Sequence, residues 1–434
     1  MKKLSLILTL LCALSIYAQK PVFKGQGPIK QIVTISKPVE KQWKGTFHFE
    51  TDGVYFSNNF EGGRLNGIER DNDSSYTVLI TPENTPINTS PWYAFKIWSK
   101  QKKQIYVTLT YSEGYRHRYY PKLSKDGLNW TSIDSTDYVE YEKGNKSFDP
   151  DSQPLKVRMK LSVDSDTLWV SAQELQTSKH VEKWVEDISK KTFISNWQIG
   201  KSKEGRPLTA LSIGKKKSKR MLMVISRQHP PEVTGYLAMK AFVETICSDL
   251  KLARKFRKKF TTYVVPLMNP DGVDNGYWRH NSGGIDLNRD WTFFNQPETL
   301  AVSEFIKNKE KETNGKFYFG IDFHSTWDDI YYTIADSLKG NMPGLVPEWL
   351  DNIKKEIHDY NPNIQPSDKM IPAIISRNYF YVSHGMEALV YEIGDNTPRE
   401  FIKEKGRVSA IELMKLMLKI SVNTVIFGNY LLFN

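Results

Sequence analysis

The chain has 434 residues, of which 39% are hydrophobic and 12% aromatic, a composition that suits two or three globular domains and excludes a fibrous or largely disordered protein. The formal net charge is +11, but no nucleic-acid-binding module is recognisable. The basic clusters at residues 215–220 and 255–259 therefore indicate either solvated surface or attraction to an anionic envelope or acidic substrate.

The N-terminus has the layout of a secretory signal peptide. Two lysines precede an apolar run over residues 4–17, and Ala18 stands before Gln19. This pattern predicts a signal peptide over residues 1–18 and an exported, periplasmic or extracellular protein. No later stretch is long and apolar enough for a membrane helix, and the apolar tail 420–432 is interpreted as a core element. After cleavage only Cys247 would remain, which excludes an internal disulfide and predicts a small core residue.

Residues 19–171 read as strands separated by turns. Hydrophobic residues alternate over residues 93–97, 105–111 and 156–163, and a further strand is predicted over 167–170. Clusters of Asp, Asn, Ser, Pro and Gly separate such runs. Short strands with a period of two and regular turns predict an N-terminal β-sandwich domain.

Residues 172–434 read as an α/β domain. A helix is indicated by Val181, Trp184, Val185 and Ile188, and a turn between two strands by residues 200–208. Strands and helices then alternate. The predicted strands are 221–225, 261–268, 316–322 and 388–393, and the predicted helices are 230–250, 298–311 and 398–420. This order predicts a mixed, mostly parallel sheet with helices on both faces.

Metal-ligating side chains follow two of these strands. His229 and Glu232 come after strand 221–225, and His324 comes after strand 316–322. Open α/β sheets keep their sites at the carboxyl ends of their strands. Two histidines and one glutamate leave a coordination position open for water, the pattern of a catalytic zinc. Asp286 is the candidate acceptor for the other ring nitrogen of His229.

A carboxylate in an otherwise apolar strand needs a partner or a task. Glu392 lies in strand 388–393, where burial would raise its pKa and suit it to act as a base and then an acid. Glu387 is the competing candidate. Arg279, Asn288 and Arg289 lie in the loop that follows Asn269-Pro-Asp-Gly272. Because guanidinium groups bind carboxylates through two parallel hydrogen bonds, this loop predicts a clamp for a free carboxylate, the equipment of a carboxypeptidase.

The order of these motifs resembles that of the zinc metallocarboxypeptidases of the carboxypeptidase A type. The cytosolic carboxypeptidase subfamily, which carries a β-sandwich before its catalytic domain, is more similar still. The likeness covers nearly all of the mature chain. The motifs that carry it are residues 60–65, 92–95 and 127–130 in the sandwich and 200–207, 269–279 and 284–291 in the second domain.

The resemblance implies a role for each matching residue. His229, Glu232 and His324 would hold one zinc ion per chain. Glu392 would transfer the proton from water to the leaving amine, and Arg279 would stabilise the oxyanion. Asn288 and Arg289 would bind the terminal carboxylate of a peptide.

The sequence also departs from the family pattern. Pro231 precedes the metal-ligating glutamate, and no tyrosine stands near residue 370, where the family has a mobile one. Tyr379 and Tyr381 are the nearest tyrosines, and Tyr379 is the candidate for substrate binding. Arg377 is either a surface residue or a cation lining the specificity pocket. In the second case it would favour an acidic C-terminal residue.

Three functions are consistent with these features. The first is a secreted zinc carboxypeptidase that acts on peptides with a free C-terminal carboxylate. The second is trimming of cell-wall peptides, whose D-Glu and diaminopimelate units carry free carboxylates. The third is a binding protein on a peptidase scaffold. Nucleic acid is not an expected partner.

Overall fold

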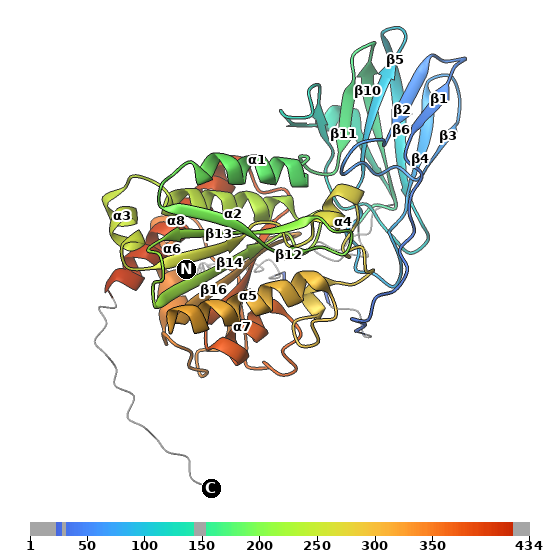
Figure 1. The fold of residues 1–434 in the computed structure, drawn as a ribbon. Coiled ribbons are helices and arrows are strands. Elements are labelled where there is room, and N and C mark those ends of the chain that lie inside the picture. The colour runs from blue at the N-terminus through green and yellow to red at the C-terminus, as the bar shows by residue number, and fades with distance from the viewer. Residues whose placement is uncertain (1–22, 28–31, 143–152, 420–434) are drawn as a thin grey trace, which may run out of the picture.

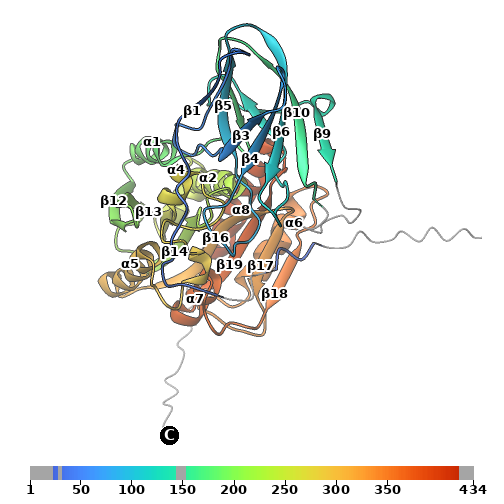
Figure 2. The same ribbon diagram turned by 90° about the vertical axis from the view of Figure 1, so that its right-hand side faces the viewer.

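The computed structural model describes residues 23–27, 32–142 and 153–419. They form a strand-rich part and an α/β part, and the strand-rich part lies over one end of the other in both views (Figures 1 and 2). The predicted signal peptide and the predicted core element at 420–432 lie outside the described residues. Among the described residues, no helix is long and apolar enough to cross a membrane.

The N-terminal part contains two sheets packed face to face. The six-stranded sheet has the order β1 (Thr46–Phe49), β2 (Val54–Ser57), β5 (Ala94–Ser99), β11 (Leu168–Ser171), β7 (Lys122–Ser124) and β8 (Thr131–Ser132). The five-stranded sheet has the order β3 (Gly67–Arg70), β4 (Ser75–Ile80), β6 (Lys103–Tyr111), β10 (Lys156–Val163) and β9 (Tyr138–Tyr141). A 3-10 turn, η1, spans Ser135–Asp137.

The period of two in the sequence produces this sandwich. In β10 every second residue is buried, so Val157, Met159 and Leu161 face inward. Phe95 and Val107 meet them in the same core. The strands predicted over 93–97, 105–111, 156–163 and 167–170 are present as β5, β6, β10 and β11, which confirms the predicted sandwich architecture.

The second part is built on an eight-stranded mixed sheet. Its order is β12 (Ile194–Lys201), β13 (Pro207–Gly214), β15 (Thr261–Val265), β14 (Arg220–Ser226), β16 (Lys316–Thr326), β19 (Glu387–Gly394), β17 (Ile330–Ile334) and β18 (Ile364–Ser367). The central strands β15, β14, β16 and β19 run parallel to one another. Their residues are buried almost throughout, because helices cover both faces.

Two hydrophobic cores lie on opposite faces of this sheet. The helices that line the first are α1 (Ser178–Ser189), α2 (Val233–Ile246), α3 (Lys251–Arg257), α6 (Leu345–Glu356) and α8 (Arg399–Lys419). The second is lined by α5 (Pro297–Thr313) and α7 (Ser376–His384). The short α4 (Pro270–Asn275) and η3 (Leu287–Arg289) lie in the loops that lead to the site. The predicted α/β fold is confirmed, and Cys247 is a buried residue of the first core.

The predicted elements differ from the observed ones mainly at their ends. The predicted helix 230–250 is α2, which begins at Val233 because Pro230 and Pro231 lie in the preceding turn, and it ends at Ile246. The sequence patterns did not predict α6 or α7. The predicted domain boundary at residue 172 falls between β11 and α1 and stays a prediction.

A buried ion pair joins the two parts. Arg118, from the loop between β6 and β7, donates through Nε to Asp395 at 2.8 Å, and each side chain is only 2% exposed. Its Nη2 group donates to the carbonyl of Ser325 at 3.3 Å, and its Nη1 group donates to Ser90. Ser325 and Asp395 lie at the carboxyl ends of β16 and β19. The sandwich therefore contacts the edge of the sheet where the predicted site lies.

We expect Arg118→Met to lower the free energy of unfolding by about 3–5 kcal/mol, because it leaves the Asp395 carboxylate buried without its partner. Urea unfolding followed by tryptophan fluorescence would measure the loss. The matched control is Arg407→Met, which breaks the exposed Arg407–Glu404 pair on α8 and should cost less than about 1 kcal/mol. Equal losses for the two variants would contradict the structural role given to Arg118.

Candidate metal centre and active site

Three buried side chains converge at the carboxyl end of the sheet. His229 lies in the turn after β14, Glu232 is the residue before α2, and His324 is near the end of β16. Their ligand atoms all lie within 4.8 Å of one another. The structure thus brings together the three predicted metal ligands, although 95 residues separate the two histidines.

The donor atoms have the arrangement of a metal site. The Nδ1 atoms of His229 and His324 are 3.2 Å apart. One carboxylate oxygen of Glu232 lies 2.8 Å from Nδ1 of His229, and the other lies 2.7 Å from Nδ1 of His324. All three side chains are at most 4% exposed.

A carboxylate holds each imidazole from behind. Nε2 of His229 lies 2.9 Å from Asp286, and Nε2 of His324 lies 2.8 Å from Asp322. A ring that donates from Nε2 presents the lone pair of Nδ1. Two such lone pairs and a carboxylate facing one another are all acceptors, and a cation satisfies them. The donor set fits one zinc ion with a position left for water.

Asp322 was missing from the sequence-based prediction. Its carboxylate also accepts hydrogen bonds from Gln228 and Ser376, so it is fixed before it meets the ring. The signal was available in the sequence, because residues two apart on a strand point to the same face. Asp322 and His324 are such a pair.

Asp286 links the metal site to the arginine loop. Its Oδ2 atom accepts a 2.7 Å hydrogen bond from Nε of Arg279, while Oδ1 faces His229. Burial opposes ionisation of Asp286, but Arg279 and His229 outweigh it and hold the pKa of this carboxyl well below its usual value. The two Nη groups of Arg279 have no hydrogen-bond partner within the described part of the chain.

Asn288 and Arg289, further along the same loop, each use part of their hydrogen-bonding capacity within the protein. Asn288 accepts a hydrogen bond at Oδ1 from the backbone N–H of Ser376, 2.9 Å away, which leaves its amide nitrogen as a donor. Arg289 donates from Nη1 to the carbonyl of Asn288 at 2.6 Å. No ion pair among the described residues includes Arg289.

A sandwich residue supports this loop. The carboxylate of Glu83, which is fully buried, accepts hydrogen bonds from the backbone N–H groups of Trp278, Arg279 and His280 at 2.8, 3.0 and 2.7 Å. The backbone that carries Arg279 is therefore fixed from outside the α/β part. Nothing in the local sequence of residue 83 indicated this contact.

The two candidate bases lie at opposite ends of β19. Glu392 is in register with His324 on the neighbouring strand, and its Oε2 atom has no hydrogen-bond partner in the described residues. Burial and the nearby Glu232 carboxylate raise the pKa of Glu392. Glu387 is in register with Phe319 and accepts hydrogen bonds from the backbone of Gly340 and Met342. It is a structural carboxylate five residues before Glu392, and its register partner Phe319 is five residues before the metal ligand His324.

The two residues predicted to contact the substrate side chain, Arg377 and Tyr379, are both buried but have different partners. Arg377 is 5% exposed and donates to the carbonyl of Thr333 and to Asn378, and burial lowers its pKa to about 10. Tyr379 packs against Trp291 in the core with its hydroxyl 3.1 Å from His384. These contacts do not favour the predicted role of Tyr379 in substrate binding.

A different tyrosine lies near the base. Tyr332 is half-buried in β17. Burial raises its pKa above the ordinary value, the Glu392 carboxylate raises it further, and the Arg377 guanidinium opposes the shift. The sequence offered no signal for Tyr332, because β17 was not predicted.

Comparison with known proteins decides the family. The zinc carboxypeptidase family matches residues 181–409, which is more than half of the chain and contains every ligand described above. The chain belongs to the zinc carboxypeptidase family. Residues 56–171 match the cytosolic carboxypeptidase N-terminal domain. Both matches confirm the resemblance drawn from the motifs, and the family uses the zinc ion that the His-Glu-His set fits.

Similar proteins include cytosolic carboxypeptidase 6 of Mus musculus, 23% identical over 289 residues, or 62% of this chain and 52% of that protein. Cytosolic carboxypeptidase 3 of Bos taurus is 22% identical over 305 residues, or 64% of this chain and 30% of that protein. An uncharacterized protein of Zymomonas mobilis is 23% identical over 253 residues, or 56% of this chain and 61% of that protein. This carboxypeptidase-family chain thus matches less than two thirds of the length of each relative.

A solved structure supports the fold. The metallo-carboxypeptidase from Burkholderia cenocepacia superposes with a TM-score of 0.68 at 17% identity, covering 84% of this chain and 99% of that one.

The prediction of export is contradicted. Two of these relatives are cytosolic carboxypeptidases by name, and residues 56–171 match the N-terminal domain of that group. An apolar run at an N-terminus is weaker evidence about location than these matches, because short hydrophobic runs also occur in segments that are not signal peptides.

We expect Asp322→Asn to weaken zinc binding about 10- to 100-fold, because His324 loses the carboxylate that fixes its ring and its basicity. Competition with a zinc chelator would measure the affinity. Asp328→Asn, two residues beyond the strand, is the control and should bind zinc as the parent does. Unchanged affinity in Asp322→Asn would show that the His324–Asp322 contact does not orient the ligand.

Proposed function

We propose that this protein is a zinc-dependent carboxypeptidase that releases the C-terminal residue of a peptide, with a preference for an acidic residue. The observation that supports this proposal most strongly is the position of Arg279. The Asp286 carboxylate accepts a hydrogen bond from its Nε and also faces His229, one of the predicted zinc ligands. This carboxylate places guanidinium donors beside the metal ligands. That arrangement suits hydrolysis next to a negatively charged chain end.

Proton transfer falls to Glu392. When bound, zinc supplies Lewis acidity that polarises a carbonyl group and makes water more acidic. Glu392 is beside His324 in register, and its Oε2 atom is not engaged by any described residue. Its carboxylate accepts the proton of the attacking water and delivers it to the amine that leaves.

The arginine loop binds the two negative charges of the reaction. Arg279 donates from its Nη groups to the oxyanion that develops on the scissile carbonyl. Arg289 and the amide nitrogen of Asn288 bind the terminal carboxylate. Because an interior peptide bond has no such carboxylate, the clamp restricts hydrolysis to the chain end.

The acidic preference rests on Arg377. No carboxylate among the described residues forms an ion pair with it, although it is almost fully buried. A buried cation without an acid needs an anionic partner, and the side chain of a C-terminal Glu or Asp would be one. We give Tyr379 no part in this proposal.

The other two functions have less support. Cell-wall peptides were suggested by the predicted export, which the comparisons contradict. A binding protein on a decayed scaffold would not need the complete His-Glu-His set with both imidazoles oriented by carboxylates.

Glu392→Gln should lower kcat roughly 10²–10⁴-fold while the protein keeps one zinc per chain, because the base is not a ligand. Peptide hydrolysis and zinc content would be measured on the same preparation. Glu387→Gln is the matched control on the same strand and should retain activity. If Glu387→Gln loses activity and Glu392→Gln does not, the assignment of the base is wrong.

Substrate preference can be tested with peptides that differ only in a C-terminal Glu, Lys or Phe. We expect the highest kcat/KM for Glu, and Arg377→Met should reduce that preference about tenfold or more, since one charge-assisted hydrogen bond is lost. The Phe peptide controls for general damage and should be hydrolysed equally well by both proteins. Equal or faster hydrolysis of the Lys or Phe peptide by the parent would end the acidic proposal.

Glu83→Gln should lower kcat about 10- to 10²-fold with zinc content unchanged, because the backbone of Arg279 loses a charged acceptor and the guanidinium moves. A double-mutant cycle separates this effect from general instability. In an Arg279→Ala background, Glu83→Gln should cause little further loss of kcat. Glu50→Gln, at an exposed position of the sandwich, is the control. Additive losses would contradict a positioning role for Glu83.

A further inference from the structure

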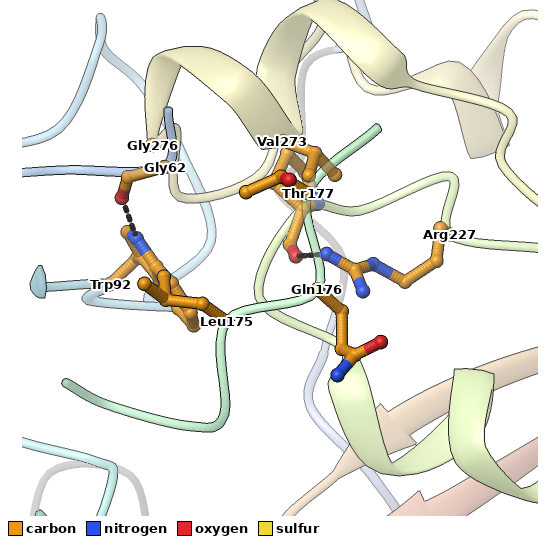
Figure 3. Close-up of a pocket in the computed structure, with 9 residues that line it drawn as sticks. Gly62, Trp92, Leu175, Gln176, Thr177, Arg227, Val273 and Gly276 are labelled. Atoms are coloured by element: carbon orange, nitrogen blue, oxygen red, sulfur yellow. Dashed lines mark hydrogen bonds between the residues drawn. The ribbon is translucent and has the colours of Figure 1, made fainter. Parts of the chain in front are cut away.

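A small cavity lies where the sandwich meets the α/β part (Figure 3). Its volume is about 10 Å³, which is room for about one water-sized occupant. Gly62 and Trp92 of the sandwich contribute to one wall, and Thr177 and Arg227 contribute to another. The zinc site described above does not include any of these residues.

Arg227 is the unusual residue of this cavity. Its side chain is buried, with an exposed fraction of 2%, and Figure 3 shows its guanidinium pointing toward Gln176 and Thr177. Nη2 donates to the carbonyl of Pro230 at 2.7 Å. Among the described residues, Nε and Nη1 have no hydrogen-bond partner, and no ion pair includes Arg227.

A buried guanidinium in this state is costly. Its donors need acceptors, and its charge needs a counter-charge. A water molecule in the cavity would accept hydrogen bonds but would supply no negative charge, and the guanidinium would face the ring of Tyr236, 5.6 Å away. A monatomic anion would satisfy both requirements, and the small volume favours it over the bulkier carboxylate or phosphate group.

We propose that this cavity binds a single halide ion, chloride under ordinary solution conditions, through Nε and Nη1 of Arg227. The ion would lie between a sandwich wall and the turn that follows β14. Arg227 has a positive φ of 59°, which a non-glycine residue adopts at a cost. The anion therefore compensates a residue that is both strained and charged.

The position of Arg227 gives the ion a structural effect. Arg227 is two residues before His229, and the one described hydrogen bond of its side chain holds the carbonyl of Pro230 in the turn that leads to Glu232. A halide that fixes this guanidinium would stabilise the turn and its contact with the sandwich. Halide should consequently raise the thermal stability of the protein whether or not the enzyme is turning over substrate.

Bromide identifies the occupant directly. A crystal of the full chain grown or soaked in sodium bromide should give an anomalous difference peak within hydrogen-bonding distance of Nε and Nη1 of Arg227. Density without an anomalous signal at that point would mean that water fills the cavity, and it would overturn the proposal.

Thermal unfolding tests the same idea in solution. The parent should unfold about 2–4 °C higher in sodium chloride than in sodium gluconate at equal ionic strength. Arg227→Met should lose this difference and, in gluconate, be at least as stable as the parent, because the uncompensated charge is gone. Arg257→Met is the matched control, because Arg257 is also buried but donates to the carbonyls of Ile246 and Ser248, and it should keep the halide effect.

Two results would contradict the site. One is equal unfolding temperatures of the parent in chloride and gluconate, and the other is a halide effect that Arg227→Met retains. If Arg227→Met does not fold, the bromide crystal of the parent still decides the question.

Discussion

The register of three parallel strands is the constraint on which the site depends. β14 and β16 are aligned with Ser226 opposite Phe323, and β16 and β19 are aligned with His324 opposite Glu392. Side chains alternate between the faces of a sheet, so a slip of one residue would turn His324 away from Glu232. The apolar cores on both faces, which contain neighbouring residues of the same strands, make such a slip costly. Burial of the core thereby places the side chains of the candidate site.

The sheet alone does not complete the site. The segment that carries Arg279 lies outside any helix or strand, so its backbone N–H groups need acceptors from elsewhere. Glu83 supplies one carboxylate for three of them. On the other side, Arg118 binds Asp395 and the carbonyl of Ser325, next to His324. The sandwich is thus part of the framework that holds both sides of the active site, and this explains why its packing against the α/β part is polar as well as apolar.

Sequence patterns were sufficient to predict the metal ligands where a side chain of ligand type directly follows a strand that its hydrophobic pattern identifies. Ligand-type side chains placed directly after apolar strands identified His229, Glu232 and His324, because the ends of parallel strands meet at one edge. The alternation of strands and helices gave the fold class. Patterns failed where the partner lies far away in the chain. Glu83 is 195 residues from Trp278 and Arg118 is 277 residues from Asp395, and in a sequence such charged residues look like surface.

Local sequence also left the role of a residue open where its type has several uses. Tyr379 stands at a plausible distance from Glu392 in the chain, but a tyrosine on a helix face is equally suited to the core, where its ring meets Trp291 and Phe294. Tyr332 lies nearer the base, yet the five residues of β17 are too few to give a clear period. The apolar N-terminal run likewise indicated export, which the relatives contradict.

The distribution of charge divides the polar residues of the candidate site into those with a charged partner inside the protein and those without one. Asp286 and Asp322 are committed to the imidazoles, and Asp286 also neutralises Arg279 through Nε. No described carboxylate forms an ion pair with Arg289 or Arg377, although Arg377 is buried and Arg289 is partly buried. Pairing these cations within the protein would stabilise the fold, and leaving them unpaired lowers stability. Under the function proposed above, binding of an anionic chain end would compensate these charges, and the electrostatic cost carried by the free protein would become selectivity for a substrate with negative charges at its terminus.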